Sequence, residues 1–154
     1  MRSLWRRGLI ATAALSLLLG GGVAGAQEPA PARGSPERLV EDYIRLYAGE
    51  TLDRWRALFH PALSVADPDA GGGIRLRALD EFFATQKERF DRGHEVSERL
   101  ENVRIQRGRR IASVSADFIF SLDGTERRGK LGLHLAEGSD GWRIVALLFS
   151  YDRP

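Results

Sequence analysis

The chain has 154 residues, with 23 lysines and arginines against 21 aspartates and glutamates, a formal net charge of +2, and no cysteine. Residues 1–26 hold three of the arginines and no acid, so the remainder has 20 basic and 21 acidic side chains and a net charge of −1. This charge gives no general affinity for phosphates, which argues against a nucleic-acid partner, and the lack of cysteine excludes disulfide bonds.

Residues 1–26 have the pattern of a signal peptide. Three arginines among the first seven residues form a positive segment, residues 9–19 are uncharged and mostly apolar, and residues 24–26 read Ala-Gly-Ala, a small-residue cleavage pattern. The apolar run is shorter than the roughly 20 residues that a membrane span needs. We therefore predict export, to a bacterial periplasm or the medium, with no membrane attachment after cleavage.

Residues 27–34 are rich in proline and alanine and have no periodicity, which is typical of a flexible linker. Residues 35–154 are then long enough to bury a core of their own, and their length predicts one domain.

Three helices are predicted in the first part of this domain. The first begins at Ser35 and Pro36, because a serine hydroxyl can cap a helix and proline is favoured at the first helical position, and it ends near Gly49. The second starts at Thr51 and stops at Pro61. The third covers residues 78–92, where apolar side chains recur at helical spacing.

The strands are predicted mainly in the second part of the domain. A short strand covers residues 63–68, and a glycine-rich turn follows it. From residue 94 the pattern changes to the two-residue period of strands, with an Asp-Gly hairpin turn at residues 123–124. The later strands are predicted at residues 94–106, 111–122, 130–136 and 142–151. Helices followed by a meandering antiparallel sheet predict an α+β fold.

This order, with "GWRIVALLFSYD" at residues 141–152 as the final strand, resembles the nuclear transport factor 2-like superfamily. That group includes the SnoaL-like polyketide cyclases, the ketosteroid isomerases and the scytalone dehydratases. The resemblance implies three N-terminal helices packed in a curved antiparallel sheet, a cystatin-like α+β roll that forms a cone with an apolar pocket at its open end. It also implies a homodimer formed through the outer face of the sheet.

Within the superfamily, the segment "YIRLYAGETLDRWRALFHPALSVADP" is most similar to ketosteroid isomerase. Tyr43 in "YIRL" and Asp67 in "SVADP" match the pocket tyrosine and the general-base aspartate of that family. The resemblance implies that Asp67 moves a proton next to a carbonyl, while Tyr43 stabilises the enolate oxygen.

The second aspartate of that family has no counterpart here. It should lie on the penultimate strand, but residues 130–136 read "KLGLHLA", and its place falls on Gly132, Leu133 or His134. If this strand face looks into the pocket, His134 takes the place of the missing acid, as a histidine does in the dehydratase branch. The alternative is a half-exposed strand histidine with no such role.

Structural alternatives exist for the other two candidates as well. Aspartate before proline is common for turn geometry alone, and Tyr43 on an apolar helix face can be a core residue. Seven aromatic residues supply core and pocket walls: Trp55, Phe59, Phe82, Phe83, Phe118, Phe120 and Phe149. The three histidines are far apart and no phosphate-binding loop is present, so we predict neither a metal nor a cofactor.

Two functions follow from these observations. The first is an exported pocket protein that binds a small hydrophobic molecule, with isomerase- or cyclase-type proton transfer at Asp67 and Tyr43. The alternative is a non-catalytic dimerisation or protein-association module of the same fold. The alternating leucines 131, 133 and 135 separate the two, because outward leucines need a partner to cover them and inward leucines fill the cone.

Overall fold

The computed structural model describes residues 34–68 and 72–152. The predicted signal peptide and residues 27–33 of the predicted linker lie outside the described residues, so both stay predictions. Within the described part of the chain, every helix is too short or too polar to cross a membrane.

The first helix starts as the sequence predicts. In α1 (Pro36–Arg45) the Ser35 hydroxyl accepts a hydrogen bond from the backbone N–H of Arg38 at 3.3 Å, and Pro36 occupies the first helical position. The helix ends earlier than predicted, at Arg45, and Gly49 begins a single 3₁₀ turn, η1 (Gly49–Thr51). Its buried face carries Tyr43, which is only 3% exposed.

The segment after this turn differs from the prediction. Helix α2 (Leu52–Arg56) is shorter than expected, and β1 (Phe59–Pro68) already begins at Phe59. A further strand, β2 (Ile74–Ala78), was not predicted, and it pairs antiparallel with β1. Helix α3 (Leu79–Asp91) then follows directly, close to its predicted bounds.

The remaining strands are β3 (Val96–Arg107), β4 (Ile111–Leu122), β5 (Thr125–Gly138) and β6 (Gly141–Tyr151). The sheet has six strands in the order β2-β1-β6-β5-β4-β3. The α+β class with helices before a curved sheet is confirmed. The sheet is mixed rather than fully antiparallel, because β1 runs parallel to β6.

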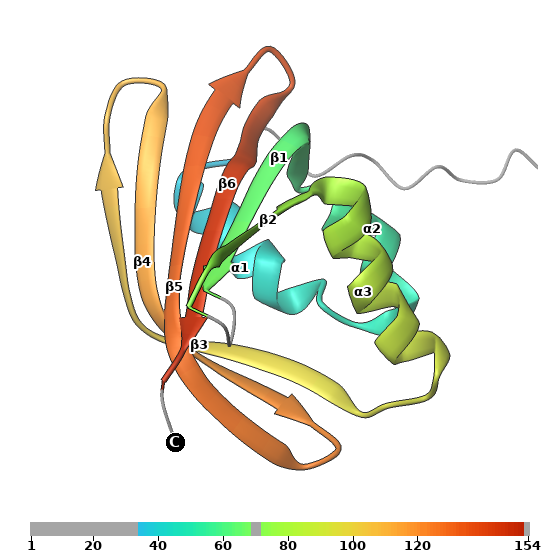
Figure 1. The fold of residues 1–154 in the computed structure, drawn as a ribbon. Coiled ribbons are helices and arrows are strands. Elements are labelled where there is room, and N and C mark those ends of the chain that lie inside the picture. Colours follow the sequence, from blue (N-terminus) through green and yellow to red (C-terminus); the bar gives the residue numbers. More distant parts are fainter. Residues whose placement is uncertain (1–33, 69–71, 153–154) are drawn as a thin grey trace, which may run out of the picture.

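Figure 1 shows all three helices on the concave side of the sheet, with β3, β4 and β5 bent so that their lower halves swing toward the helices. Two local features accompany this bend. The pairing of β3 with β4 shifts register between Glu101 and Arg104, where Asn102 has a φ of 51°. In β5, a Cβ on Gly129 would lie 2.2 Å from the Ser150 carbonyl oxygen and 2.6 Å from the Phe118 ring, so only glycine fits there.

The concave face of the sheet forms the core with the helices. Leu131, Leu133 and Leu135 all point to this side and are at most 6% exposed. The sequence left open which side of the sheet these leucines face, and the structure shows that they face inward. The complementary residues of β5, among them Lys130 and His134, lie on the outer face.

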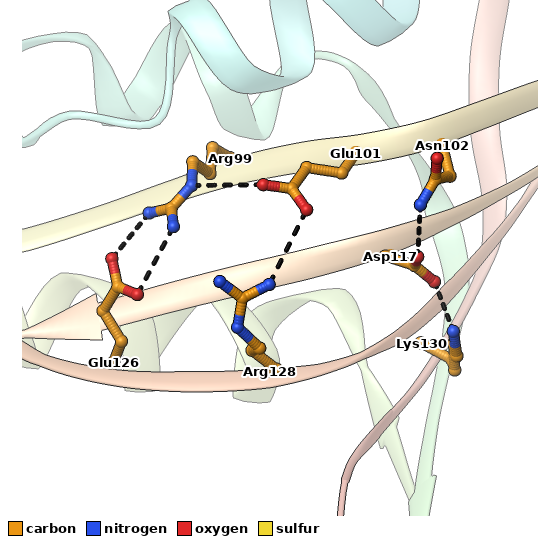
Figure 2. A network of polar contacts seen from close by, with 7 residues as sticks. All are labelled: Arg99, Glu101, Asn102, Asp117, Glu126, Arg128 and Lys130. Atoms are coloured by element: carbon orange, nitrogen blue, oxygen red, sulfur yellow. Dashed lines mark hydrogen bonds and ion pairs between the residues drawn. The ribbon is translucent and has the colours of Figure 1, made fainter.

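The outer face of the bend carries a charged network that Figure 2 shows in detail. Its members are Arg99, Glu101, Asn102, Asp117, Glu126, Arg128 and Lys130. Arg99 binds Glu126 at 2.7 Å, and Arg128 reaches Glu101 at 3.6 Å. Ile119 lies between these arginines in the strand register and is only 1% exposed, because long arginine stems cover apolar surface.

Candidate active site

A cavity of about 680 Å³ lies between α3 and the concave face of the sheet. Its apolar lining comes from Phe82, Phe118, Phe120, Leu131, Leu147 and Phe149. From the sequence we expected a purely apolar lining, but the cavity also has charged groups in its wall. These groups are four arginines and three acids: Arg75, Arg77, Arg89, Arg127, Glu81, Glu98 and Asp123.

One carboxyl and one phenol meet inside this cavity. Tyr43, from α1, donates a hydrogen bond to Glu98 Oε1, from β3, at 3.1 Å. Glu98 sits on the inward side of β3, opposite Phe120 in the strand register. Burial raises the pKa of Glu98 from 4.5 to about 7, against the lowering effects of the Tyr43 hydrogen bond and the positive charge of Arg89. Glu98 therefore changes its charge near neutral pH.

The Tyr43 phenol stays protonated over the whole physiological range. Burial, followed by the negative charge of Glu98, raises the pKa of Tyr43 well above its ordinary value. The Tyr43 ring is held by neighbouring aromatic rings, with Trp55 at 5.6 Å and Phe59 at 6.2 Å between centroids. The hydroxyl is thus a fixed donor aimed at Glu98.

The side chain of Gln86 holds Arg89 in place. Gln86 is 5% exposed, and its side-chain oxygen accepts hydrogen bonds from the Tyr47 hydroxyl at 2.6 Å and from Arg89 Nη1 at 2.7 Å. The Arg89 guanidinium also lies 5.1 Å from the centre of the Phe120 ring. Arg89 is therefore oriented by neutral partners, over the ring that is next to Glu98.

Asp67 has a different environment from Glu98. It is 4% exposed, it does not line the cavity, and both of its oxygens accept hydrogen bonds from guanidinium groups. Arg75 Nε binds Oδ1 at 3.1 Å, and Arg77 Nη2 binds Oδ2. Asp67 and Tyr43 share no hydrogen bond in the described part of the chain, and the partner of Tyr43 is Glu98.

Arg77 forms part of the cavity wall and binds Asp67, which does not line the cavity itself. Its guanidinium stacks 5.3 Å from the Phe82 ring centre and 5.8 Å from that of Phe149. The Arg77 side chain is 5% exposed, and its Nε has no hydrogen-bond partner within the described residues. A buried donor of this kind is costly unless it is satisfied, so it marks a place where a polar group can bind.

The family follows from the sequence. The model of the SnoaL-like domain family matches residues 37–153. The chain belongs to the SnoaL-like family. No curated protein matches its sequence.

Solved structures of the same fold are similar to this SnoaL-like domain at low sequence identity. Bd1075 of Bdellovibrio bacteriovorus aligns with a TM-score of 0.63 and 10% identity over 75% of this chain, which spans only 40% of that protein. A provisionally named scytalone dehydratase of Novosphingobium aromaticivorans aligns at 0.61 and 15%, covering 76% and 81% of the two chains. An NTF2-like protein of unknown function from Shewanella baltica gives 0.58 and 13%, covering 77% and 91%.

In this SnoaL-like domain His134 does not line the cavity. It lies exposed on the outer face of β5, where its Nδ1 is 3.2 Å from the Ser113 hydroxyl. The condition on which its replacement of the second acid depended, a strand face turned toward the pocket, is therefore not met. Among the described residues, no group of three or more histidines and acids is placed to hold a metal ion.

The seven aromatic residues divide between cavity and core. Phe82, Phe118, Phe120 and Phe149 line the cavity. Trp55 and Phe59 do not, because they are fully packed beneath α1, at 1% and 3% exposed. Phe83 does not line it either, and its ring lies 5.3 Å from the Arg56 guanidinium.

The charged residues of the site were not among those predicted from the sequence. The detectable signal was an acid on an apolar strand face, since Val96, Glu98 and Leu100 share one side of β3. Arg75 and Arg77 carry a weaker signal, because their two-residue spacing places both on one face of a strand that was not predicted.

Proposed function

We propose that this SnoaL-like domain binds a small molecule in the concave cavity and transfers a proton on it with Glu98 and Tyr43. The observation that carries the proposal is the position of Glu98, a carboxyl inside the cavity with a pKa of about 7. A group that is half protonated at neutral pH serves both as an acid and as a base. Perturbed titratable groups in a cavity are typical of active sites.

The chemistry is a proton shift next to a carbonyl, of the isomerase or cyclase type. The Glu98 carboxylate takes a proton from the carbon beside the carbonyl, and the electron pair of that C–H bond moves onto the carbonyl oxygen as an enolate. As Glu98 takes up that proton, the Tyr43 hydroxyl turns its hydrogen bond from Glu98 to the developing charge on the carbonyl oxygen. Glu98 then returns the proton to another carbon of the same molecule, so that no other reactant is needed.

This proposal moves the base from Asp67 to Glu98. Both Asp67 oxygens are already occupied by Arg75 and Arg77, and Asp67 does not line the cavity. We assign Asp67 the role of neutralising and positioning the arginines in the wall. The role of Tyr43 stays as the resemblance implied, with Glu98 as its partner.

The test is proton exchange with solvent. The purified protein is incubated in deuterated water with a panel of cyclic ketones and β-ketoesters, and the loss of the proton signal beside the carbonyl is followed by NMR. We expect exchange that is lost in Glu98→Gln and reduced in Tyr43→Phe. Glu101→Gln, on the outer face, is the matched control. Exchange that persists unchanged in Glu98→Gln contradicts the assignment.

A second candidate function is association through the outer surface. Ile74 and Leu76 of β2 are 73% and 68% exposed, and Leu148 of β6 is 45% exposed. Exposed apolar side chains on a sheet favour a partner, which for the non-catalytic alternative is a second copy of this chain. Sedimentation equilibrium of Leu76→Ser against the unmodified chain tests this, and equal masses in dilute solution for both contradict it.

We also propose export, on the basis of the first 26 residues. The arginine-rich start, the apolar run and the Ala-Gly-Ala sequence support cleavage after Ala26. The intact mass of the protein from the exported fraction of its host tests this, and a mass that retains the first 26 residues contradicts it.

A further inference from the structure

We propose that the cavity of this SnoaL-like domain takes a singly charged organic acid, whose carboxylate binds between Arg89 and Arg127 while Glu98 carries a proton. This inference rests on the proposed function, since it names the class of ligand for the same cavity. It replaces the expectation of a purely hydrophobic ligand.

The strand register brings the acid and one arginine into a single row. Glu98 of β3 lies opposite Phe120 of β4, and Phe120 lies opposite Arg127 of β5. Adjacent strands are about 4.8 Å apart, so Glu98 and Arg127 stand one strand to either side of the Phe120 ring. Arg89 reaches the same ring from α3, at 5.1 Å. Arg89 therefore lies over the Phe120 ring, and Arg127 extends from the same row of residues with its guanidinium on the Tyr151 ring.

Both of these guanidiniums lack an acid partner. Within the described residues neither Arg89 nor Arg127 forms an ion pair; Arg89 binds the neutral Gln86, and Arg127 stacks on the Tyr151 ring at 3.7 Å. Arg75 and Arg77, by contrast, share the Asp67 carboxylate. Guanidinium groups have fixed donor directions that match a carboxylate.

The net charge of the groups around the cavity favours a ligand with a single negative charge. The charged groups are the arginines Arg75, Arg77, Arg89 and Arg127 and the acids Glu81, Glu98 and Asp123 of the lining, with Asp67 behind the wall. These four positive and four negative charges cancel when Glu98 is ionised. When Glu98 is protonated one positive charge is left over, and a monoanion balances it.

The groups around Glu98 make its protonation depend on whether a ligand is bound. The groups that face it are Tyr43 from α1, Tyr47 from the turn after α1, Arg89 from α3 and Tyr151 from β6, with Phe120 beside it on β4. Arg89 is the charged member of this set. A ligand carboxylate at Arg89 screens this charge from Glu98 and adds a like charge nearby. Binding therefore favours the protonated form of Glu98, and the ionised fraction that remains is the base of the proposed proton transfer.

The rest of the cavity determines the body of the ligand. The wall beyond the arginines consists of Phe118, Phe149, Leu131 and Leu147. These side chains suit an aromatic or aliphatic skeleton attached to the carboxylate. The buried Nε of Arg77 provides a further hydrogen-bond donor for a neutral oxygen on that skeleton.

The first experiment compares two probes of equal shape by isothermal titration calorimetry, 2-naphthoate and its neutral amide, 2-naphthamide. We expect the carboxylate to bind at least about tenfold more tightly, as one charge-assisted contact provides. Arg127→Gln and Arg89→Gln should each remove this difference. Arg128→Gln, the neighbouring arginine on the outer face, should leave it unchanged, and circular dichroism verifies that all variants are folded.

Two further measurements complete the test: the pH dependence of 2-naphthoate binding, and the affinity for a dianion of similar shape. The affinity for 2-naphthoate should fall as the pH rises through about 7, the pKa of Glu98, and Glu98→Gln should remove this fall. Equal affinity for the two probes, no detectable binding of either, or an equal loss in Arg127→Gln and Arg128→Gln overturns the proposal. Tighter binding of the dianion 2-naphthyl phosphate than of 2-naphthoate overturns it too. Proton exchange that still depends on Glu98 would then leave the proposed function standing without this ligand class.

Discussion

The substitution Glu98→Gln should remove a loss of stability that the unmodified protein shows as the pH rises toward neutral. The pKa of Glu98 is 4.5 in the unfolded chain and about 7 in the folded protein, because burial opposes its charge. Each pKa unit corresponds to about 1.4 kcal/mol. Ionised Glu98 therefore lowers the free energy of unfolding by about 3 kcal/mol.

The direction follows from proton binding. Below pH 4.5 the carboxyl is protonated in both states and has no effect. Between pH 4.5 and about 7 the unfolded chain has released its proton and the folded protein has kept it, so the free energy of unfolding falls as the pH rises. Glutamine has no proton to lose. The Glu98→Gln variant should therefore gain about 3 kcal/mol relative to the unmodified protein between pH about 5 and about 8.

Urea denaturation across this pH range measures the effect, since the midpoint and slope give the free energy of unfolding at each pH. Glu101→Gln is the control, because Glu101 lies at the surface in ion pairs with Arg99 and Arg128. Its curve should stay within about 1 kcal/mol of the unmodified protein at every pH. If the difference between Glu98→Gln and the unmodified protein is constant with pH, Glu98 is not held in its protonated form, and the reasoning about the site is refuted.

Three further substitutions test other parts of the structure. Asp67→Asn removes the charge that balances the buried Arg77 and should lower the free energy of unfolding by about 3–5 kcal/mol in urea denaturation; a change below about 1 kcal/mol would show that the pair is dispensable. Tyr43→Phe removes a hydrogen bond that lowers the pKa of Glu98, so an infrared titration of that carboxyl should move to higher pH, and an unmoved titration would contradict the pairing. Gly129→Ala places a Cβ against the neighbouring strand and should cost about 1–3 kcal/mol, measured as a lower Tm, whereas an unchanged Tm would mean that the strand adjusts freely.

Local signals predicted many of the elements. Ser35 and Pro36 marked the start of α1, and the Asp-Gly pair marked the β4–β5 hairpin, where Asp123 and Gly124 have φ values of 50° and 79°. These features depend on a few adjacent residues, so sequence alone reveals them. Strand β2 was missed because its apolar side chains, Ile74 and Leu76, face outward, and the order of its residues does not distinguish a strand from a loop.

The site depended on pairings that no local pattern contains. Tyr43 was identified through the family resemblance, and it does line the cavity. Its partner Glu98 lies 55 residues away in the chain, on a strand whose register shifts at Asn102, so the side that Glu98 faces could not be deduced. The same uncertainty of parity put His134 among the candidates. The charge of the cavity wall could be predicted only once β2 was known to be a strand.

The position of β6 has a consequence for when the chain can fold. Strand β6 pairs with β1 on one side and with β5 on the other, so it is the only sheet connection between the β1–β2 pair and the β3–β5 meander in the described part of the chain. Strand β6 is the last strand to be synthesised. Until it is made, the two halves of the sheet share no backbone hydrogen bonds. The six-stranded sheet therefore cannot be completed until synthesis has passed Tyr151, so the joining of its two halves is the last pairing step of folding.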